Sequence, residues 1–327
     1  MADLSYGQPL FMNIRQFDWR DLALLLRYRH RGIFFDYASV LTRGEILVPT
    51  RALLSYFAST IGVYTYLCTP DNHQSETLLG QITHGQGKQL SHLSFLAPAT
   101  ALDDDNLLAM LDYIVQQIGK RGALHLLAEV EEHSPAFENL RQAGFALYVH
   151  QRIWKNIADV QQTESQSQWR DISSRDAIAV RSLYDILVPP LVQQVESLPN
   201  KQMKGLVYYL DGDLMAYAEI RYGPQGIWVK PFVHPDIQNI TDLMGDLLHN
   251  LPNRHSRPIY FCIRSYQSWL ENALEDLQAD AGPTQVVMVK HLAVAKKVIN
   301  SFAIPTLESG TQEITTPFVN SERQNSI

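Results

Sequence analysis

The stretch from Leu90 to Trp154 constrains the fold of this chain more than any other part of the sequence. It holds two short apolar runs, Leu93 to Leu96 and Ala123 to Val130, which do not alternate with polar residues. Such runs are typical of strands that are buried on both faces. Between them the apolar residues recur with helical spacing, at positions 107, 108, 111, 114, 115 and 118. This order predicts two strands at the centre of a sheet, separated by an amphipathic helix.

A second helix is predicted after these strands. It begins at Ser134, with Pro135 in the first turn, where proline is well tolerated. It ends at Gly144, a residue that commonly follows the last turn of a helix. A strand from Phe145 to Trp154 then completes the unit.

A weaker version of this pattern returns later in the chain. The segment SFLAP at 94–98 aligns with PFVHP at 231–235, and FENL at 137–140 lies near the position of LENA at 270–273. The second part also has the strongest hairpin signal of the chain, at Asp211 and Gly212. We therefore predict one fold present twice: a first domain at 1–155, a linker at 156–169, a second domain at 170–300 and a mobile tail at 301–327.

The composition of the chain argues against several classes of protein, such as those that bind nucleic acid or membranes. With 46% hydrophobic residues, 19% charged residues and a formal net charge of −7, the chain has the composition of a globular protein and is not expected to bind nucleic acid or acidic membranes. Its two cysteines are too few for a disulfide framework, and the sequence starts without a recognisable leader, which predicts a cytoplasmic protein. No metal-binding motif is found, so no metal is expected. No membrane-spanning segment is predicted either.

The order of elements in each half resembles that of the GNAT superfamily of N-acetyltransferases. The likeness is best in SPAFENLRQAGF, where Ala136, Leu140, Gly144 and Phe145 are similar to the helix of that family that ends in Gly-Phe before a strand. The fold that this resemblance implies is α/β of the α+β type, with two tandem GNAT-like domains, each a mixed central sheet flanked by helices. It also implies acetyl-CoA or another acyl-CoA as cofactor, and a small-molecule amine or a peptide amine as acceptor.

In the family, the pantetheine arm lies between the central strand and a splayed neighbour, and the pyrophosphate lies at the N-terminus of the next helix. In the first half this turn carries Asp103, Asp104 and Asp105 and no glycine. A carboxylate roughly 6 Å from a phosphate charge repels it by about 3 kcal/mol at an effective dielectric constant near 20. We therefore place the cofactor in the second half, at the residues around its corresponding strand ends, which are Lys230, Phe232, Val233, His234 and Arg264.

The usual tyrosine acid of the family is replaced by Leu140 in the first half and by Leu274 at the approximate counterpart in the second. Glu129 is the candidate base and Tyr266 the candidate acid, each at a strand end. Two hypotheses follow from the resemblance. The chain is either a GNAT-like N-acyltransferase or a non-catalytic GNAT-fold module for binding or dimerisation, and a homodimer is left open.

Overall fold

The computed structural model describes residues 12–45, 47–57, 62–70, 76–101, 105–156, 168–198 and 203–292. These residues belong to one compact unit that spans Met1–Val294. The predicted tail at 301–327 and most of the predicted linker at 156–169 lie outside the described residues. We call residues 12–156 the first half and residues 168–292 the second half.

The elements of the first half follow the predicted order, with additional short elements near its start. They are β1 (Met12–Gln16), α1 (Leu22–Tyr28), β2 (Ile33–Phe34), α2 (Tyr37–Arg43), α3 (Leu47–Phe57), β3 (Val63–Pro70), β4 (Leu78–His84), β5 (Leu90–Ala97), α4 (Asp105–Lys120), β6 (His125–Glu131), α5 (Pro135–Gln142) and β7 (Ala146–Asn156).

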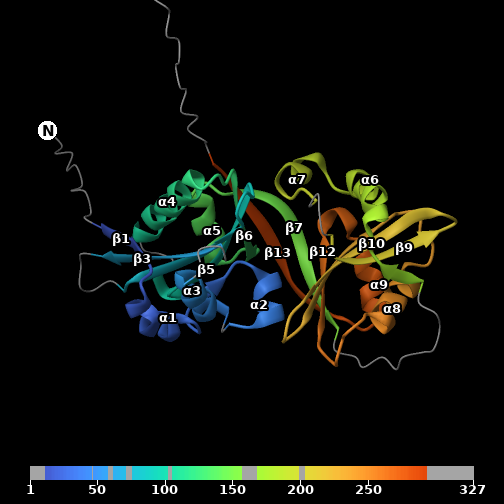
Figure 1. Cartoon of the computed structure of the whole chain (residues 1–327), viewed down its shortest axis with the longest axis horizontal. Helices are drawn as coiled ribbons and strands as arrows, with labels where there is room; N and C mark the ends of the chain where they lie inside the picture. The colour runs from blue at the N-terminus through green and yellow to red at the C-terminus, as the bar shows by residue number, and fades with distance from the viewer. Residues whose placement is uncertain are drawn as a thin grey trace, which may run out of the picture. The chain divides into compact units, whose positions relative to one another are not determined.

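The second half repeats this order. Its elements are β8 (Trp169–Asp171), α6 (Ala177–Leu187), α7 (Pro190–Val195), β9 (Gly205–Leu210), β10 (Asp213–Tyr222), β11 (Ile227–Val233), α8 (Ile240–Asn250), β12 (Ile259–Arg264), the short 3-10 helix η5 (Ser265–Gln267), α9 (Leu270–Asp276) and β13 (Asp280–His291). Figure 1 shows the two sets of helices and strands. The predicted fold class, a mixed sheet flanked by helices in each of two halves, is confirmed.

Local sequence signals explain where several elements begin and end. The Ser134 side chain accepts a hydrogen bond from the backbone N–H of Phe137 at 3.3 Å, so it caps α5, and Pro135 is the first helical residue. The turn between β9 and β10 holds Asp211 at φ 52° and Gly212 at φ 94°. Both values lie in the left-handed region that two-residue hairpin turns require, which is why the Asp-Gly pair predicted this hairpin.

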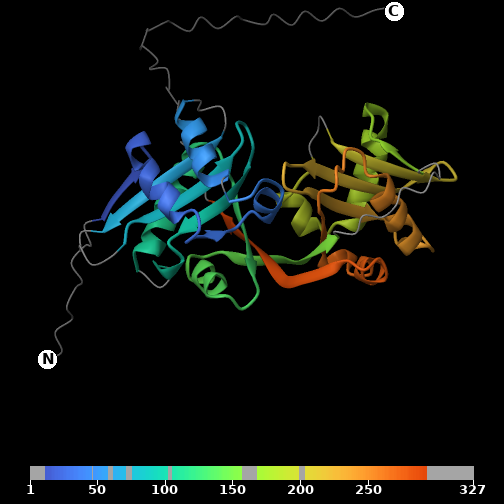
Figure 2. The ribbon, with the colours of Figure 1, turned by 90° about the horizontal axis from the view of Figure 1, so that it is seen from below.

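The last strand of each half completes the sheet of the other half. All described strands except β2 lie on one path, in the order β1-β3-β4-β5-β6-β13-β7-β12-β11-β10-β9-β8. In this order β13 pairs with β6 of the first half, β7 pairs with β12 of the second half, and β7 and β13 pair with each other. Figure 2 shows these two long strands, green and red-orange, lying side by side between the halves. We call this arrangement the strand exchange.

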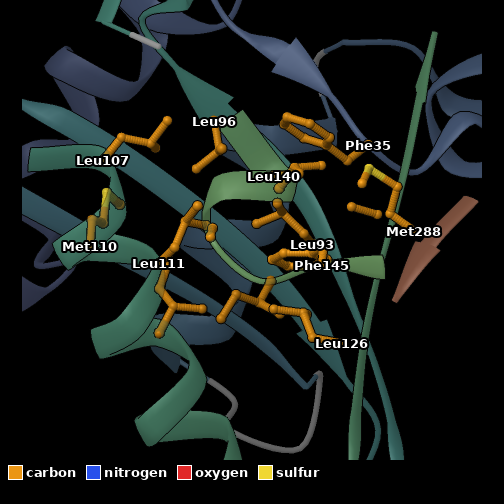
Figure 3. Close-up of a cluster of buried hydrophobic side chains, with 14 of the residues drawn as sticks. Phe35, Leu93, Leu96, Leu107, Met110, Leu111, Leu126, Leu140, Phe145 and Met288 are labelled. Atoms are coloured by element: carbon orange, nitrogen blue, oxygen red, sulfur yellow. The ribbon is translucent and has the colours of Figure 1, made fainter. Parts of the chain in front are cut away.

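The hydrophobic cores follow the same exchange. Val286 and Met288 of β13 are fully buried in the core of the first half, among residues of α4, α5 and the neighbouring strands. Figure 3 shows Met288 in the same cluster as Leu140 and Phe145. Conversely, Trp154 of β7, a strand of the first half, is buried in the core of the second half. Each half therefore depends on the other for part of its core.

Buried polar groups link the exchanged strands. The Gln151 side chain on β7 donates a hydrogen bond to Gln285 Oε1 on β13 at 2.9 Å. The Cys262 thiol on β12 donates to Gln151 Oε1 at 3.3 Å. Because an unpaired buried amide is costly, this chain of contacts favours a single register across the three strands.

Two openings interrupt the hydrogen bonding of the sheet. Strands β5 and β6 run parallel and pair only from Leu90–His92 to His125–Leu127. Strands β11 and β12 likewise pair only from Ile227–Val229 to Ile259–Phe261. Beyond these positions each pair of strands diverges, so each half contains one opening at the carboxyl ends of two parallel strands. We call them the first and the second opening.

Candidate functional site

The first opening is filled by a segment of the chain itself. Strand β2 pairs with β5, with Ile33 opposite Leu96 and Phe34 opposite Phe95. The next residue, Phe35, bridges the two diverging strands: its N–H donates to Ser94 O on β5 at 3.1 Å, and its carbonyl accepts from Glu129 N on β6 at 3.0 Å. The backbone groups on both sides of the first opening are therefore already hydrogen-bonded.

The second opening is bridged by one side chain. Gln267 of η5 is 1% exposed, and its carboxamide reaches the end of β11. It accepts from the backbone N–H of Val233 at 2.9 Å and donates to the carbonyl of Pro231 at 3.0 Å. Gln267 was not singled out by the sequence, and it occupies backbone groups at the edge where Phe232 and Val233 were predicted to bind the cofactor.

Lys230 and Arg264, two of the predicted cofactor-binding residues, meet at one carboxylate. Lys230 Nζ lies 2.8 Å from Glu196 Oε2, and Arg264 Nη2 lies 2.9 Å from Glu196 Oε1. Glu196 directly follows α7 and was missed by the sequence. Burial alone would raise the pKa of Glu196, but the charges of Arg264 and Lys230 outweigh burial and hold that pKa well below its ordinary value. The three side chains form a buried ionic cluster, which we call the Glu196 cluster.

Several polar atoms beside this cluster have no hydrogen-bond partner within the described part of the chain. Arg264 is 4% exposed, yet its Nε and Nη1 are unpaired, and so is the hydroxyl of Tyr266. Burial raises the pKa of Tyr266, so the phenol keeps its proton near neutral pH. Buried donors without acceptors cost free energy, which marks this side of the cluster as incomplete.

Glu129, the predicted base, lies within electrostatic reach of this cluster. It stands near the end of β6, where one carboxylate oxygen accepts the backbone N–H of Tyr37 at 2.9 Å. Burial raises the pKa of Glu129 to about 7, although the Arg264 charge opposes the shift. No cation of the described ranges lies within 4 Å of its carboxylate. The structure thus brings a residue of the first half into electrostatic contact with Arg264 of the second half.

Helices from both halves cover this side of the strands. Ala38 of α2 packs in a cluster with Trp228 and Cys262 of the second half. Helix α7 of the second half is held against β7 of the first half, because the Tyr148 hydroxyl donates a hydrogen bond to the carbonyl of Val192. The candidate site is therefore built from both halves, with strands as its base and α2 and α7 beside it. In Figure 2, α2 lies next to strands of the second half, which are drawn in yellow.

Of the remaining predicted site residues, Phe232 lies beside the cluster. It is buried, Lys230 Nζ lies 5.6 Å from its ring centroid, and its ring stacks on Tyr217 with centroids 5.8 Å apart. His234 follows β11, and its Nδ1 lies 3.6 Å from a carboxylate oxygen of Asp236, not beside Glu196. Asp103 and Asp104 lie outside the described residues. Leu140 and Leu274 are both buried in hydrophobic cores, at 1% and 0% exposure.

Glu129→Gln gives a pH-dependent test of this environment. A carboxyl group whose pKa rises from 4.5 to about 7 on folding binds its proton more tightly in the folded state. The contribution of the Glu129 proton to stability is therefore fully present below pH 4.5 and is lost as the pH rises through 7. The loss amounts to roughly 3 kcal/mol, at about 1.36 kcal/mol per pKa unit. The Gln variant does not titrate. We expect its stability relative to wild type to improve by up to about 3 kcal/mol between pH 4.5 and pH 8, measured by urea unfolding.

Glu131→Gln is the matched control, because this residue lies two positions along β6 and its side chain is exposed. This variant should show no comparable gain in stability over wild type in the same interval. An equal pH response in both variants would contradict the assignment of a raised pKa to Glu129.

Comparisons with known proteins agree with this fold. No protein-family model and no curated protein sequence matches the chain. Among solved structures, a GCN5-related N-acetyltransferase from Sphaerobacter thermophilus is similar, with a TM-score of 0.52 and 11% identity, over 87% of this chain and 97% of that chain. A candidate acetyltransferase from Pyrococcus horikoshii has a TM-score of 0.50 and 10% identity, over 91% of this chain and 95% of that one. A tandem GNAT protein from the clavulanic acid biosynthesis pathway has a TM-score of 0.49 and 9% identity, over 86% and 98%.

The protein has the fold of the GNAT N-acetyltransferases. It carries that fold twice in tandem, once in each half, with the exchanged strands between them. No described helix is long and apolar enough to cross a membrane. Among the described residues there is also no group of three or more metal-ligating side chains.

Proposed function

We propose that the protein is an acyl-CoA-dependent N-acyltransferase with one composite site, in which the first half supplies the base and the second half receives the cofactor. The observation that carries this proposal is the position of the Glu129 carboxylate at the end of β6, where it accepts the backbone N–H of Tyr37 at 2.9 Å, burial raises its pKa to about 7 and the charge of Arg264 acts on it. A general base is most efficient when its pKa lies near the working pH. The acceptor that suits such a base is an amine, of a small molecule or of a peptide.

The proposed reaction assigns one proton to each side of the site. Glu129 takes a proton from the neutral acceptor amine as the amine nitrogen forms a bond to the thioester carbonyl carbon. The carbon–sulfur bond then breaks, and the departing thiolate receives a proton from Tyr266, whose raised pKa keeps it protonated until that step. Acyl-CoA supplies the activated acyl group when bound.

The two openings differ in how a cofactor could enter. The first opening is filled by backbone that belongs to β2 and Phe35, and clearing it would break main-chain hydrogen bonds on both sides. The second opening is bridged by a single side chain, which can rotate away. The carboxamide of Gln267 also offers the same donor and acceptor pair as an amide of pantetheine, so an amide ligand can replace both of its hydrogen bonds. We therefore place the cofactor in the second opening only.

Isothermal titration with coenzyme A and acetyl-CoA tests this proposal. We expect one molecule bound per chain. In Gln267→Ala, coenzyme A should bind about tenfold more tightly or better, because the ligand no longer competes with two internal hydrogen bonds and the free variant leaves two backbone groups unsatisfied. Gln116→Ala, on the exposed face of α4, is the control and should leave the affinity unchanged.

The number of coenzyme A molecules bound per chain tests how many openings accept a cofactor, and binding to wild type and to Gln267→Ala tests the proposed activity. Two molecules bound per chain would show that the first opening also accepts a cofactor. No binding to wild type or to Gln267→Ala would overturn the acyltransferase proposal.

The alternative function is a non-catalytic binding or dimerisation module, and one observation is compatible with it. Backbone groups at both openings are hydrogen-bonded within the chain, by Phe35 in one half and by Gln267 in the other. Absence of coenzyme A binding in the titration above would support this candidate. Sedimentation of the full chain would then measure whether it forms a homodimer.

A further inference from the structure

The Glu196 cluster is one negative charge short of neutrality. Lys230 and Arg264 contribute two positive charges against the single carboxylate of Glu196, and none of the three is more than 15% exposed. Buried charges are normally paired because desolvation of an unpaired charge is costly. The unbalanced positive charge lies on the side of Arg264, because two of its guanidinium nitrogens have no acceptor in the described part of the chain.

The neighbouring titratable groups do not supply the missing anion as a direct partner. Glu129 and Asp36 interact electrostatically with groups of the site, but neither forms an ion pair with Arg264 within 4 Å. His92 also faces the cluster, and burial lowers its pKa, so it stays neutral at pH 7. Asp36 uses its side chain to cap α2, by accepting the N–H of Ser39 at 3.0 Å.

We propose that the unpaired side of Arg264 binds the carboxylate of the acceptor, so that the acceptor is an amine that also carries a carboxylate, as an amino acid does. This inference rests on the proposed function, in which Glu129 receives the proton of the acceptor amine. A bound carboxylate gives two negative charges against two positive ones. The planar guanidinium suits a carboxylate better than a point cation would, because it offers several donors in fixed geometry.

The charge balance also distinguishes an acceptor carboxylate from a cofactor phosphate. A carboxylate carries the single negative charge that the cluster lacks, whereas the pyrophosphate of coenzyme A carries two or more. If the pyrophosphate bound here, the site would hold a net buried negative charge beside Glu129. The raised pKa of Glu129 shows that burial already disfavours a negative charge at this place. Solvent does not reach the unpaired atoms of Arg264 in this structure. The ligand therefore enters when contacts such as the Gln267 bridge, three residues further along the chain, are displaced.

Matched ligand pairs test the inference. Each ω-amino acid of a homologous series, from glycine to 6-aminohexanoate, is titrated against the full chain beside the n-alkylamine that has its amine and methylene chain without the carboxylate. We expect one spacing of amine and carboxylate to bind at least about tenfold more tightly than its matched amine, since hydrogen bonds between charged groups are the strong ones. In Arg264→Gln this ratio should fall to about one.

Two further variants separate loss of the carboxylate site from loss of the fold. Arg264→Lys retains the positive charge beside Glu196 and protects the fold, while it removes the planar donors, so it should also reduce the ratio. Arg141→Gln removes an arginine on α5 that is 59% exposed and paired with Glu138, and the ratio should stay at the wild-type value. A ratio that survives in both Arg264 variants would overturn the inference, and so would acetate or phosphate binding as tightly as the best amino acid.

Coenzyme A is titrated in parallel, so that the two proposals fail separately. Coenzyme A binding without any preference for the amino acid overturns this inference and leaves the acyltransferase proposal standing. A preference that is lost in Arg264→Gln, without coenzyme A binding, supports the carboxylate site and overturns the acyltransferase proposal.

Discussion

Replacing Met288 with alanine is expected to lower the free energy of unfolding of the chain by about 2–5 kcal/mol, the usual cost of truncating a fully buried methionine. Met288 is 0% exposed, and it belongs to the second half in sequence but to the core of the first half in space. The loss should therefore be felt in the first half. Urea unfolding measures the size of the effect, and hydrogen exchange resolved by peptide shows where it falls.

Peptides from α4 and β5 should lose protection in this variant as much as peptides from β13. Leu147→Ala is the control, because Leu147 lies on β7 at 49% exposure and its truncation should cost no more than about 0.5 kcal/mol. Loss of protection confined to the second half would contradict the strand exchange.

Glu196→Gln is expected to destabilise the protein by about 3–5 kcal/mol at pH 7, because removing one partner of a buried ionic contact leaves uncompensated charge behind. Here two cations, Lys230 and Arg264, lose their carboxylate together. The pH dependence has a definite sign. Since the pKa of Glu196 is lowered on folding, its contribution is fully present above the ordinary carboxyl pKa and is lost as the pH falls below it.

The difference between wild type and Glu196→Gln should therefore shrink between pH 7 and pH 3, as measured by urea midpoints at both values. Glu138→Gln is the matched control. Glu138 pairs with Arg141 on the exposed surface of α5, where side chains are more than half exposed, so its loss should cost less than about 1 kcal/mol at either pH. Equal costs for the two variants would contradict the buried ionic cluster.

The sequence predicted most of the secondary structure because its signals are local. The apolar stripe of α4, the Ser134 cap of α5 and the Asp211–Gly212 turn each depend on residues a few positions apart. Helices α2 and α7 were not predicted. They are seven and six residues long, too short for a helical period to stand out from the surrounding sequence.

The strand exchange could not be predicted from these signals. A buried strand such as β13 has the same apolar pattern whether it pairs with β12 or with β6, because the pattern records burial and not the identity of the neighbour. For the same reason the sequence placed Glu129 and Arg264 in separate halves as separate candidates. Their proximity depends on which strands lie next to each other.

Residues that complete the site were missed for a related reason. Glu196 follows a short helix in a polar segment, where a carboxylate is most often a solvated surface residue. Gln267 and Phe35 act through hydrogen bonds to strands distant in sequence, and nothing in their neighbouring residues indicates those partners. The roles of Glu129, Tyr266 and the predicted cofactor-binding residues stay predictions, for which the titrations above are the test.

The strand exchange also has a consequence for biosynthesis. The first half lacks one of its strands until the ribosome has passed His291, so its sheet ends at an unpaired β6 edge while the whole second half is being made. At about 5–20 residues per second, this interval lasts on the order of ten to thirty seconds. Unlike a chain of independent domains, this protein cannot finish folding its first half before β13 has been made. The nascent chain carries an open strand edge throughout that interval, which is the period in which chaperone binding or aggregation would compete with folding.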